Sequence, residues 1–203
     1  YYFKTNDAQL KKELSEAGIC FLHAPLFHTA LKNVAGVRKS LGLRTFFNML
    51  GPLVNPAAPA YQMIGVYNHE MARIYTYMLQ KKGQPFSIVH TLDGYDELSL
   101  TADAKVITEK GERVYSPLQL GKRTVQAADI SGGASVSDAA KIFVRILRSE
   151  GTWAQNAVVL ANAAMALHTT GKYATYDEAY HTAVESLESG AALKSLQTLI
   201  QLQ

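Results

Sequence analysis

Apolar and polar positions alternate along the first third of the chain in blocks that predict helices and strands in turn. Residues 7–17 have helical spacing, with Asp7 as the expected cap and Gly18 as the expected end. Residues 19–22 form a short, wholly apolar run, which predicts a buried strand. We expect a second helix over 28–41 and then an irregular, proline-containing loop over 44–59.

The middle of the chain continues this alternation. Strands are predicted at 61–67 and 86–90, with an amphipathic helix over 70–82 between them that ends at Gly83. Helices between buried strands favour an α/β fold with a mainly parallel sheet. Residues 104–115 instead resemble a hairpin with a polar turn at 109–111, so we expect the sheet to be mixed.

From residue 135 onward the pattern is helical throughout. We expect helices over 135–149, 152–169, 175–189 and 191–202, the first opened by a capping sequence that begins at Ser135. The predicted fold class is therefore α/β, with a mixed, mainly parallel sheet flanked by helices and a helical carboxyl-terminal segment. We expect residues 1–203 to form a single α/β domain.

Composition and charge narrow the function only slightly. Apolar residues make up 48% of the 203 residues and the net charge is +3, which is milder than a dedicated nucleic-acid binder usually shows. The single cysteine, Cys20, lies in an apolar run and has no partner for an internal disulfide, which favours a reducing, cytoplasmic location. No apolar stretch is long enough to span a bilayer.

One candidate site lies on the predicted helix 28–41. His28, Leu31, Ala35 and Arg38 share one face of that helix, and the planar guanidinium of Arg38 suits a two-pronged contact with a carboxylate. This face is suited to lining a channel for a flat acid. Alternatively, Arg38 only complements the negative end of the helix, and His28 has a packing role at the helix start.

A second candidate site is the acidic loop 93–97, Asp-Gly-Tyr-Asp-Glu. It follows an apolar strand, so we expect it at the carboxyl end of that strand, where open α/β folds bind ligands. Gly94 allows a tight bend, and neighbouring carboxylates can hold Mg²⁺ together with waters and phosphate oxygens. The alternative interpretation is a solvated acidic turn.

A third, weaker candidate is the glycine-containing segment 131–135. Glycines before a helix can present backbone N–H groups to a phosphate, but this segment lacks the lysine of a nucleotide-binding loop. We therefore interpret it as a structural turn. The sequence also has no cysteine and histidine spacing suited to zinc and no spacing that suggests a hydrolytic triad.

The longest motif resembles a known family. Residues 33–56, Asn-Val-Ala-Gly-Val-Arg-Lys-Ser-Leu-Gly-Leu-Arg-Thr-Phe-Phe-Asn-Met-Leu-Gly-Pro-Leu-Val-Asn-Pro, are similar to the signature of the anthranilate phosphoribosyltransferases. The acidic loop, residues 129–133 and the helical segment 156–167 resemble further segments of that family in the same order. The first motif is specific, and the resemblance extends from about residue 17 to residue 193.

The resemblance implies a function and a role for four residues. Arg38 matches the arginine that contacts anthranilate, and His28 matches a residue near the mouth of its channel. Asp96 and Glu97 match the carboxylates that hold Mg²⁺ against the diphosphate of phosphoribosyl pyrophosphate (PRPP). The implied reaction transfers a phosphoribosyl group to anthranilate in tryptophan biosynthesis and needs no strong base. We therefore name no catalytic residue.

The sequence departs from the family pattern in two ways. Four positions carry unusual residues, and two of them, Leu31 and Tyr95, lie near the expected site; the others are Thr29 and Val54. The family's glycine-rich phosphate loop, its Lys-His-Gly-Asn-Arg segment and its amino-terminal dimerisation domain have no counterpart here. We therefore expect a carboxyl-terminal fragment of a longer homodimeric enzyme, inactive by itself.

Two other functions remain open at this point. A pyrimidine nucleoside phosphorylase-like enzyme would share the implied fold and also act at an anomeric carbon. A non-enzymatic, nucleic-acid-binding relative of the same fold would use a basic surface in place of a metal site, which the modest net charge disfavours.

Overall fold

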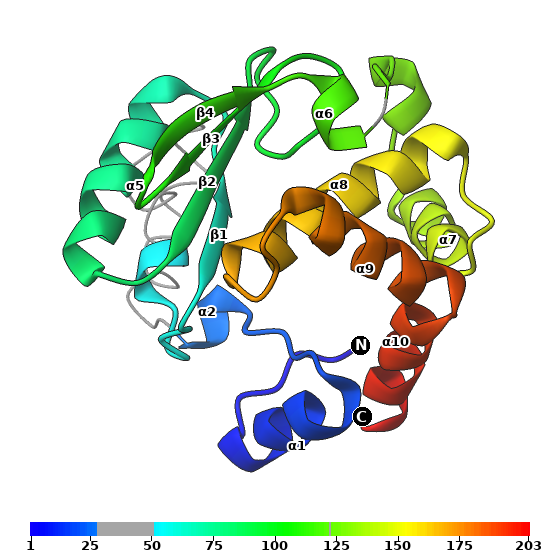
Figure 1. The fold of residues 1–203 in the computed structure, drawn as a ribbon. Helices are drawn as coiled ribbons and strands as arrows, with labels where there is room; N and C mark the ends of the chain where they lie inside the picture. The colour runs from blue at the N-terminus through cyan, green and yellow to red at the C-terminus, as the bar shows by residue number, and fades with distance from the viewer. Residues whose placement is uncertain (28–50, 122) are drawn as a thin grey trace. The chain divides into compact units, whose positions relative to one another are not determined.

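The computed structural model describes residues 1–27, 51–121 and 123–203 (Figure 1). They divide into two compact units, residues 1–59 with 194–203 and residues 60–193. The prediction of one domain over the whole chain stays a prediction. The sheet and the acidic loop both belong to the second unit.

The first unit contains helix α1 (Asp7–Ala17), the short helix α2 (Ala24–Phe27) and the 3₁₀ helix η1 (Gly51–Val54). Helix α1 has the predicted bounds and ends at Gly18, whose φ of 73° suits glycine. The predicted cap was wrong, because the side chain of Asn6, not Asp7, accepts the N–H of Gln9 at 3.1 Å.

The predicted strand at 19–22 was also wrong. Its residues have no regular secondary structure, and the four described strands pair only with one another. Ile19 and Phe21 are exposed. An extended apolar segment becomes a strand only when a neighbour supplies hydrogen-bond partners, and no described strand does so here.

The second unit is built on a four-stranded sheet with the order β1 (Gln62–Gly65), β2 (Phe86–Thr91), β3 (Ala104–Thr108) and β4 (Gly111–Tyr115). Strands β1 and β2 are parallel, whereas β2–β3 and β3–β4 are antiparallel. The mixed sheet and the hairpin are confirmed. Antiparallel pairs outnumber parallel ones among the described strands, because the hairpin contributes two pairings and residues 19–22 contribute none.

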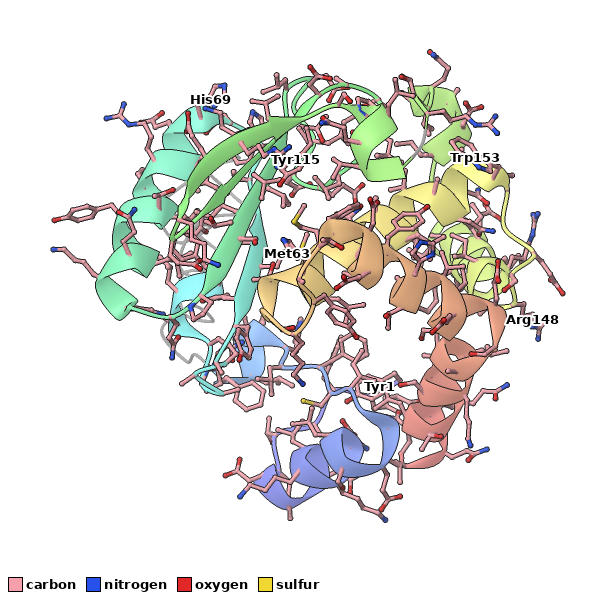
Figure 2. All side chains as sticks on the ribbon, in the orientation of Figure 1. Tyr1, Met63, His69, Tyr115, Arg148 and Trp153 are labelled. Atoms are coloured by element: carbon pink, nitrogen blue, oxygen red, sulfur yellow. The ribbon has the colours of Figure 1, made fainter. Side chains whose placement is uncertain are left out.

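Helices cover both faces of this sheet. Helix α5 (His69–Lys82) connects β1 to β2 and lies on one face, whereas α8 (Trp153–Thr169) lies on the other (Figure 1). All six residues of β2 are buried, as expected for a strand covered on both faces. Met63 packs against the core from β1 and Tyr115 does so from β4; both are labelled in Figure 2.

The carboxyl-terminal half is helical, as predicted. It comprises α6 (Pro117–Gly121), the 3₁₀ helix η2 (Ala127–Ile130), α7 (Val136–Leu147), α8, α9 (Tyr176–Glu188) and α10 (Ala191–Gln201). Helix α8 starts at a capping box formed by Thr152 and Gln155. No helix among the described residues is long and apolar enough to cross a membrane.

Candidate functional site

The acidic loop leaves the sheet where the sequence predicted. Strand β2 ends at Thr91, and because β1 runs parallel to β2, Gly65 at the end of β1 lies at the same edge of the sheet. The turn is tight: the N–H of Gly94 donates to the carbonyl of Thr91 at 2.9 Å, and Gly94 has a φ of 105°. The bend predicted at Gly94 is therefore confirmed.

Gly65 forms the seat on which the loop rests. A Cβ atom added to Gly65 would lie 1.6 Å from the backbone oxygen of Asp96, so only glycine leaves room for the loop at this point. Sequence reasoning did not single out this residue. A glycine inside a predicted strand was the available signal, since it often marks the close approach of another backbone.

Two side chains from the second unit hold the backbone next to Glu97. The hydroxyl of Thr91 donates to the Glu97 carbonyl at 2.5 Å, and the carboxamide of Asn162 on α8 forms hydrogen bonds with both the N–H and the carbonyl of Leu98. Neither Thr91 nor Asn162 was a predicted site residue. Thr91 is six residues from Glu97, whereas Asn162 is 64 residues from Leu98, and a contact across that separation is not visible in the local sequence pattern.

The three carboxylates of the loop have different surroundings. Asp93 accepts a hydrogen bond from the Thr101 hydroxyl at 2.6 Å, so its oxygens are engaged within the protein. The side chains of Asp96 and Glu97 are exposed and have no hydrogen bond or ion pair with any residue that the structure describes. The pair is therefore available to a ligand.

The electrostatics of this pair favour a cation. Partial burial, followed by the charge of Asp96, raises the pKa of the Glu97 carboxyl above its ordinary value. Both causes penalise the ionised form of Glu97, and a bound cation would relieve the repulsion between the two charges.

The two carboxylates of Asp96 and Glu97 suit Mg²⁺ better than they suit a metal ion whose ligands all come from the protein. Among the described residues, no group of three or more His, Cys, Asp or Glu side chains could hold a metal. Mg²⁺ commonly uses one or two carboxylates and completes its octahedron with waters and substrate phosphates. Asp96 and Glu97 match that requirement.

The other predicted site residues have different outcomes. Arg38 and His28 lie outside the described residues, so their roles stay predictions. In the glycine-containing segment, Gly133 has a φ of 87° and Ser135 caps α7 by accepting the N–H of Asp138 at 3.1 Å. Both features agree with the interpretation of this segment as a structural turn.

A cavity of about 650 Å³ lies at the opposite end of β2 from the acidic loop. Its lining includes Phe86 and Ser87 at the start of β2 and His168 at the end of α8. Asp96 and Glu97 do not line this cavity, so the cavity is not part of the candidate metal site.

Comparison with known proteins identifies the family to which this chain belongs. Residues 1–193 match the model of the glycosyl transferase family, a/b domain, and the chain belongs to that family. The resemblance to the anthranilate phosphoribosyltransferases, which the motifs predicted, is confirmed by individual relatives. The chain is 50% identical over 201 residues to the anthranilate phosphoribosyltransferase of Cytophaga hutchinsonii and 48% identical over 200 residues to that of Flavobacterium johnsoniae.

These matches cover nearly all of this chain but only part of each relative. They include 99% and 98% of the chain, which spans 61% and 60% of the lengths of the two relatives. Among solved structures, the anthranilate phosphoribosyltransferase of Thermus thermophilus matches with a TM-score of 0.85 at 32% identity, over 96% of this chain and 58% of that one.

The Saccharomyces cerevisiae enzyme, solved in complex with PRPP and Mg, is also similar. It matches with a TM-score of 0.87 at 26% identity, over 98% of this chain and 56% of that one. These likenesses confirm the predicted α/β fold.

Proposed function

We propose that this chain is part of an anthranilate phosphoribosyltransferase, which transfers the phosphoribosyl group of PRPP to anthranilate and releases diphosphate. The observation that carries the proposal is the pair Asp96 and Glu97 at the carboxyl edge of β1 and β2, whose side chains have no hydrogen bond or ion pair with a described residue. The names of the similar proteins and the PRPP and Mg complex of the yeast enzyme support it. We also propose a cytoplasmic homodimer that dimerises through a region outside this chain.

In this proposal the protein contributes positioning and charge, without a general base. Asp96 and Glu97 would hold a Mg²⁺ ion, which would neutralise charge on the departing diphosphate. Arg38 orients the carboxylate of anthranilate, and His28 lies near the channel mouth. A bond forms between the anthranilate nitrogen and the anomeric carbon as the bond from that carbon to the diphosphate oxygen breaks, and the amine proton passes to solvent.

The proposal is tested by the substrate requirement of the complete gene product. We expect diphosphate release only when anthranilate, PRPP and Mg²⁺ are all present, and no turnover from residues 1–203 alone. Phosphorolysis of thymidine would instead favour the nucleoside phosphorylase-like alternative. Salt-dependent retardation of DNA or RNA in a gel, without diphosphate release, would favour the nucleic-acid-binding relative.

A further inference from the structure

The backbone that follows the acidic pair is held at four consecutive polar groups by two side chains. Asn162 accepts the N–H of Leu98 at 3.0 Å and donates to the carbonyl of Leu98 at 3.1 Å. Its second amide hydrogen donates to the carbonyl of Val158 at 2.9 Å, so one turn of α8 fixes the plane of the carboxamide. The group is therefore rigid before it meets the loop.

Thr91 holds the groups on either side of Leu98. Its hydroxyl donates to the carbonyl of Glu97 at 2.5 Å and accepts the N–H of Ser99 at 3.3 Å. Thr91, Leu98 and Ser99 have no solvent exposure, so water cannot replace these bonds without opening the core. We call Thr91 and Asn162 the clasp.

The clasp forms hydrogen bonds with the backbone of residues 97–99, the segment that begins at Glu97. Glu97 has no other described contact through its own side chain, so the direction of its carboxylate depends on the backbone between Asp96 and Leu98. Asp96 on the other side rests against Gly65. The loop is thus held by its packing against Gly65 at Asp96 and by the clasp after Glu97.

We propose that Thr91 and Asn162 are positioning residues, which aim the Asp96 and Glu97 carboxylates at one magnesium-bound diphosphate. This inference rests on the proposed function. Supporting groups of this kind commonly change metal affinity about 10–100-fold when they are removed. The clasp specifically joins the sheet edge to α8, so it makes the geometry of the metal ligands depend on the packing of that helix.

Thr91 and Asn162 would make the same contacts if they served only to stabilise the fold. A second hydrogen bond between α8 and β2, away from the acidic loop, distinguishes this structural role from the positioning role. At the other end of β2, the Thr169 hydroxyl of α8 donates to the Ser87 hydroxyl at 2.7 Å. Thr169→Val removes this bond between α8 and β2 without contact with the acidic loop, so it is the control for a general loosening of the helix.

The test uses the complete gene product with two clasp variants. Asn162→Asp places carboxylate oxygens against the carbonyls of Leu98 and Val158, and the milder Thr91→Val removes only a hydroxyl from a side chain of similar shape. Calorimetric titration gives the affinity for PRPP with and without Mg²⁺. Hydrogen exchange of the metal-free protein, followed over 92–101, gives a readout that needs neither metal nor turnover.

We expect each clasp variant to weaken Mg²⁺-dependent PRPP binding about tenfold while it changes metal-free PRPP binding less than about twofold. Exchange over 92–101 should rise in the clasp variants and stay unchanged in Thr169→Val. If Asn162→Asp does not fold, the result for Thr91→Val alone tests the positioning role. Equal losses with and without Mg²⁺, or clasp variants that behave like Thr169→Val, would overturn the positioning role.

Failure of the proposed function has a different signature. If Asp96→Asn with Glu97→Gln leaves the Mg²⁺ titration unchanged, these residues are not the ligands, and both proposals are overturned. If that double variant loses the Mg²⁺ effect while the clasp variants keep it, the positioning role alone is overturned.

Discussion

At the scale of single residues, the backbone of Asp96 lies against Gly65, and the backbone after Glu97 is hydrogen-bonded to the side chain of Asn162. The position of Asp96 and Glu97 was predictable because an apolar strand followed by Asp-Gly-Tyr-Asp-Glu places carboxylates at a strand end, whereas their role as metal ligands is implied by the family resemblance and stays a prediction. Gly65 and Asn162 were not predictable, because each meets the loop across a long stretch of sequence. Their roles follow from the packing of β1 and α8, which the local pattern does not encode.

Gly65→Ala tests the seat under the acidic loop. A methyl group at this position would overlap the Asp96 carbonyl, so the loop must move away from the sheet edge. We expect Mg²⁺-dependent PRPP affinity to fall about tenfold or more. The control is Gly132→Ala, where an added Cβ meets nothing within 4 Å. Wild-type affinity in Gly65→Ala would contradict the account of the loop.

Arg38→Ala tests the assignment of the acceptor site. Loss of a bidentate contact to the anthranilate carboxylate should raise the KM for anthranilate about tenfold or more and leave the KM for PRPP nearly unchanged. Steady-state kinetics of the complete gene product measure both constants. An equal rise in both would count against the assigned role, and Arg38→Lys shows whether charge alone is sufficient.

At the scale of secondary-structure elements, the predicted helices that fall within the described residues are present, because their end signals are mostly local. Gly18 ends α1 as predicted, and Ser135 caps α7 by accepting the N–H of Asp138 where a capping sequence was predicted. The strand prediction at 19–22 failed because a strand depends on a partner that no local pattern reveals. The short elements α6 and η2 lie in a stretch for which no element was predicted.

Tyr176→Phe tests how α9 is joined to its neighbours. The Tyr176 hydroxyl lies 2.9 Å from the Leu120 carbonyl and 3.2 Å from the Ala161 carbonyl, linking α9 to α6 and α8. Removing it should lower the free energy of unfolding by about 1–2 kcal/mol near pH 7. Denaturant titration measures this loss, and Tyr77→Phe, at an exposed position, is the control.

The same contact predicts a pH dependence. Burial is the main cause that raises the pKa of Tyr176 far above its ordinary value of 10.0, so the folded state keeps the phenol neutral. The stabilisation is complete below pH 10 and is lost as the pH rises further, because only the unfolded state then releases the proton. The difference between wild type and Tyr176→Phe should therefore shrink above pH 10. A constant difference would contradict this assignment.

At the scale of the whole molecule, the chain belongs to the glycosyl transferase family, a/b domain. The family model covers residues 1–193, whereas the chain spans about three fifths of its curated relatives. The mixed character of the sheet was predictable from the hairpin turn at 109–111. The balance between parallel and antiparallel pairs was not, because it depends on whether residues 19–22 find a partner.

The most direct test of the central claim is the affinity of the complete gene product for PRPP, measured by calorimetry across a Mg²⁺ titration. Wild type should bind PRPP more tightly as Mg²⁺ rises, and Asp96→Asn with Glu97→Gln should lose that gain. Glu185→Gln with Glu188→Gln removes two exposed carboxylates from α9 and should behave as wild type. An unaltered Mg²⁺ response in the Asp96 and Glu97 double variant would contradict the account.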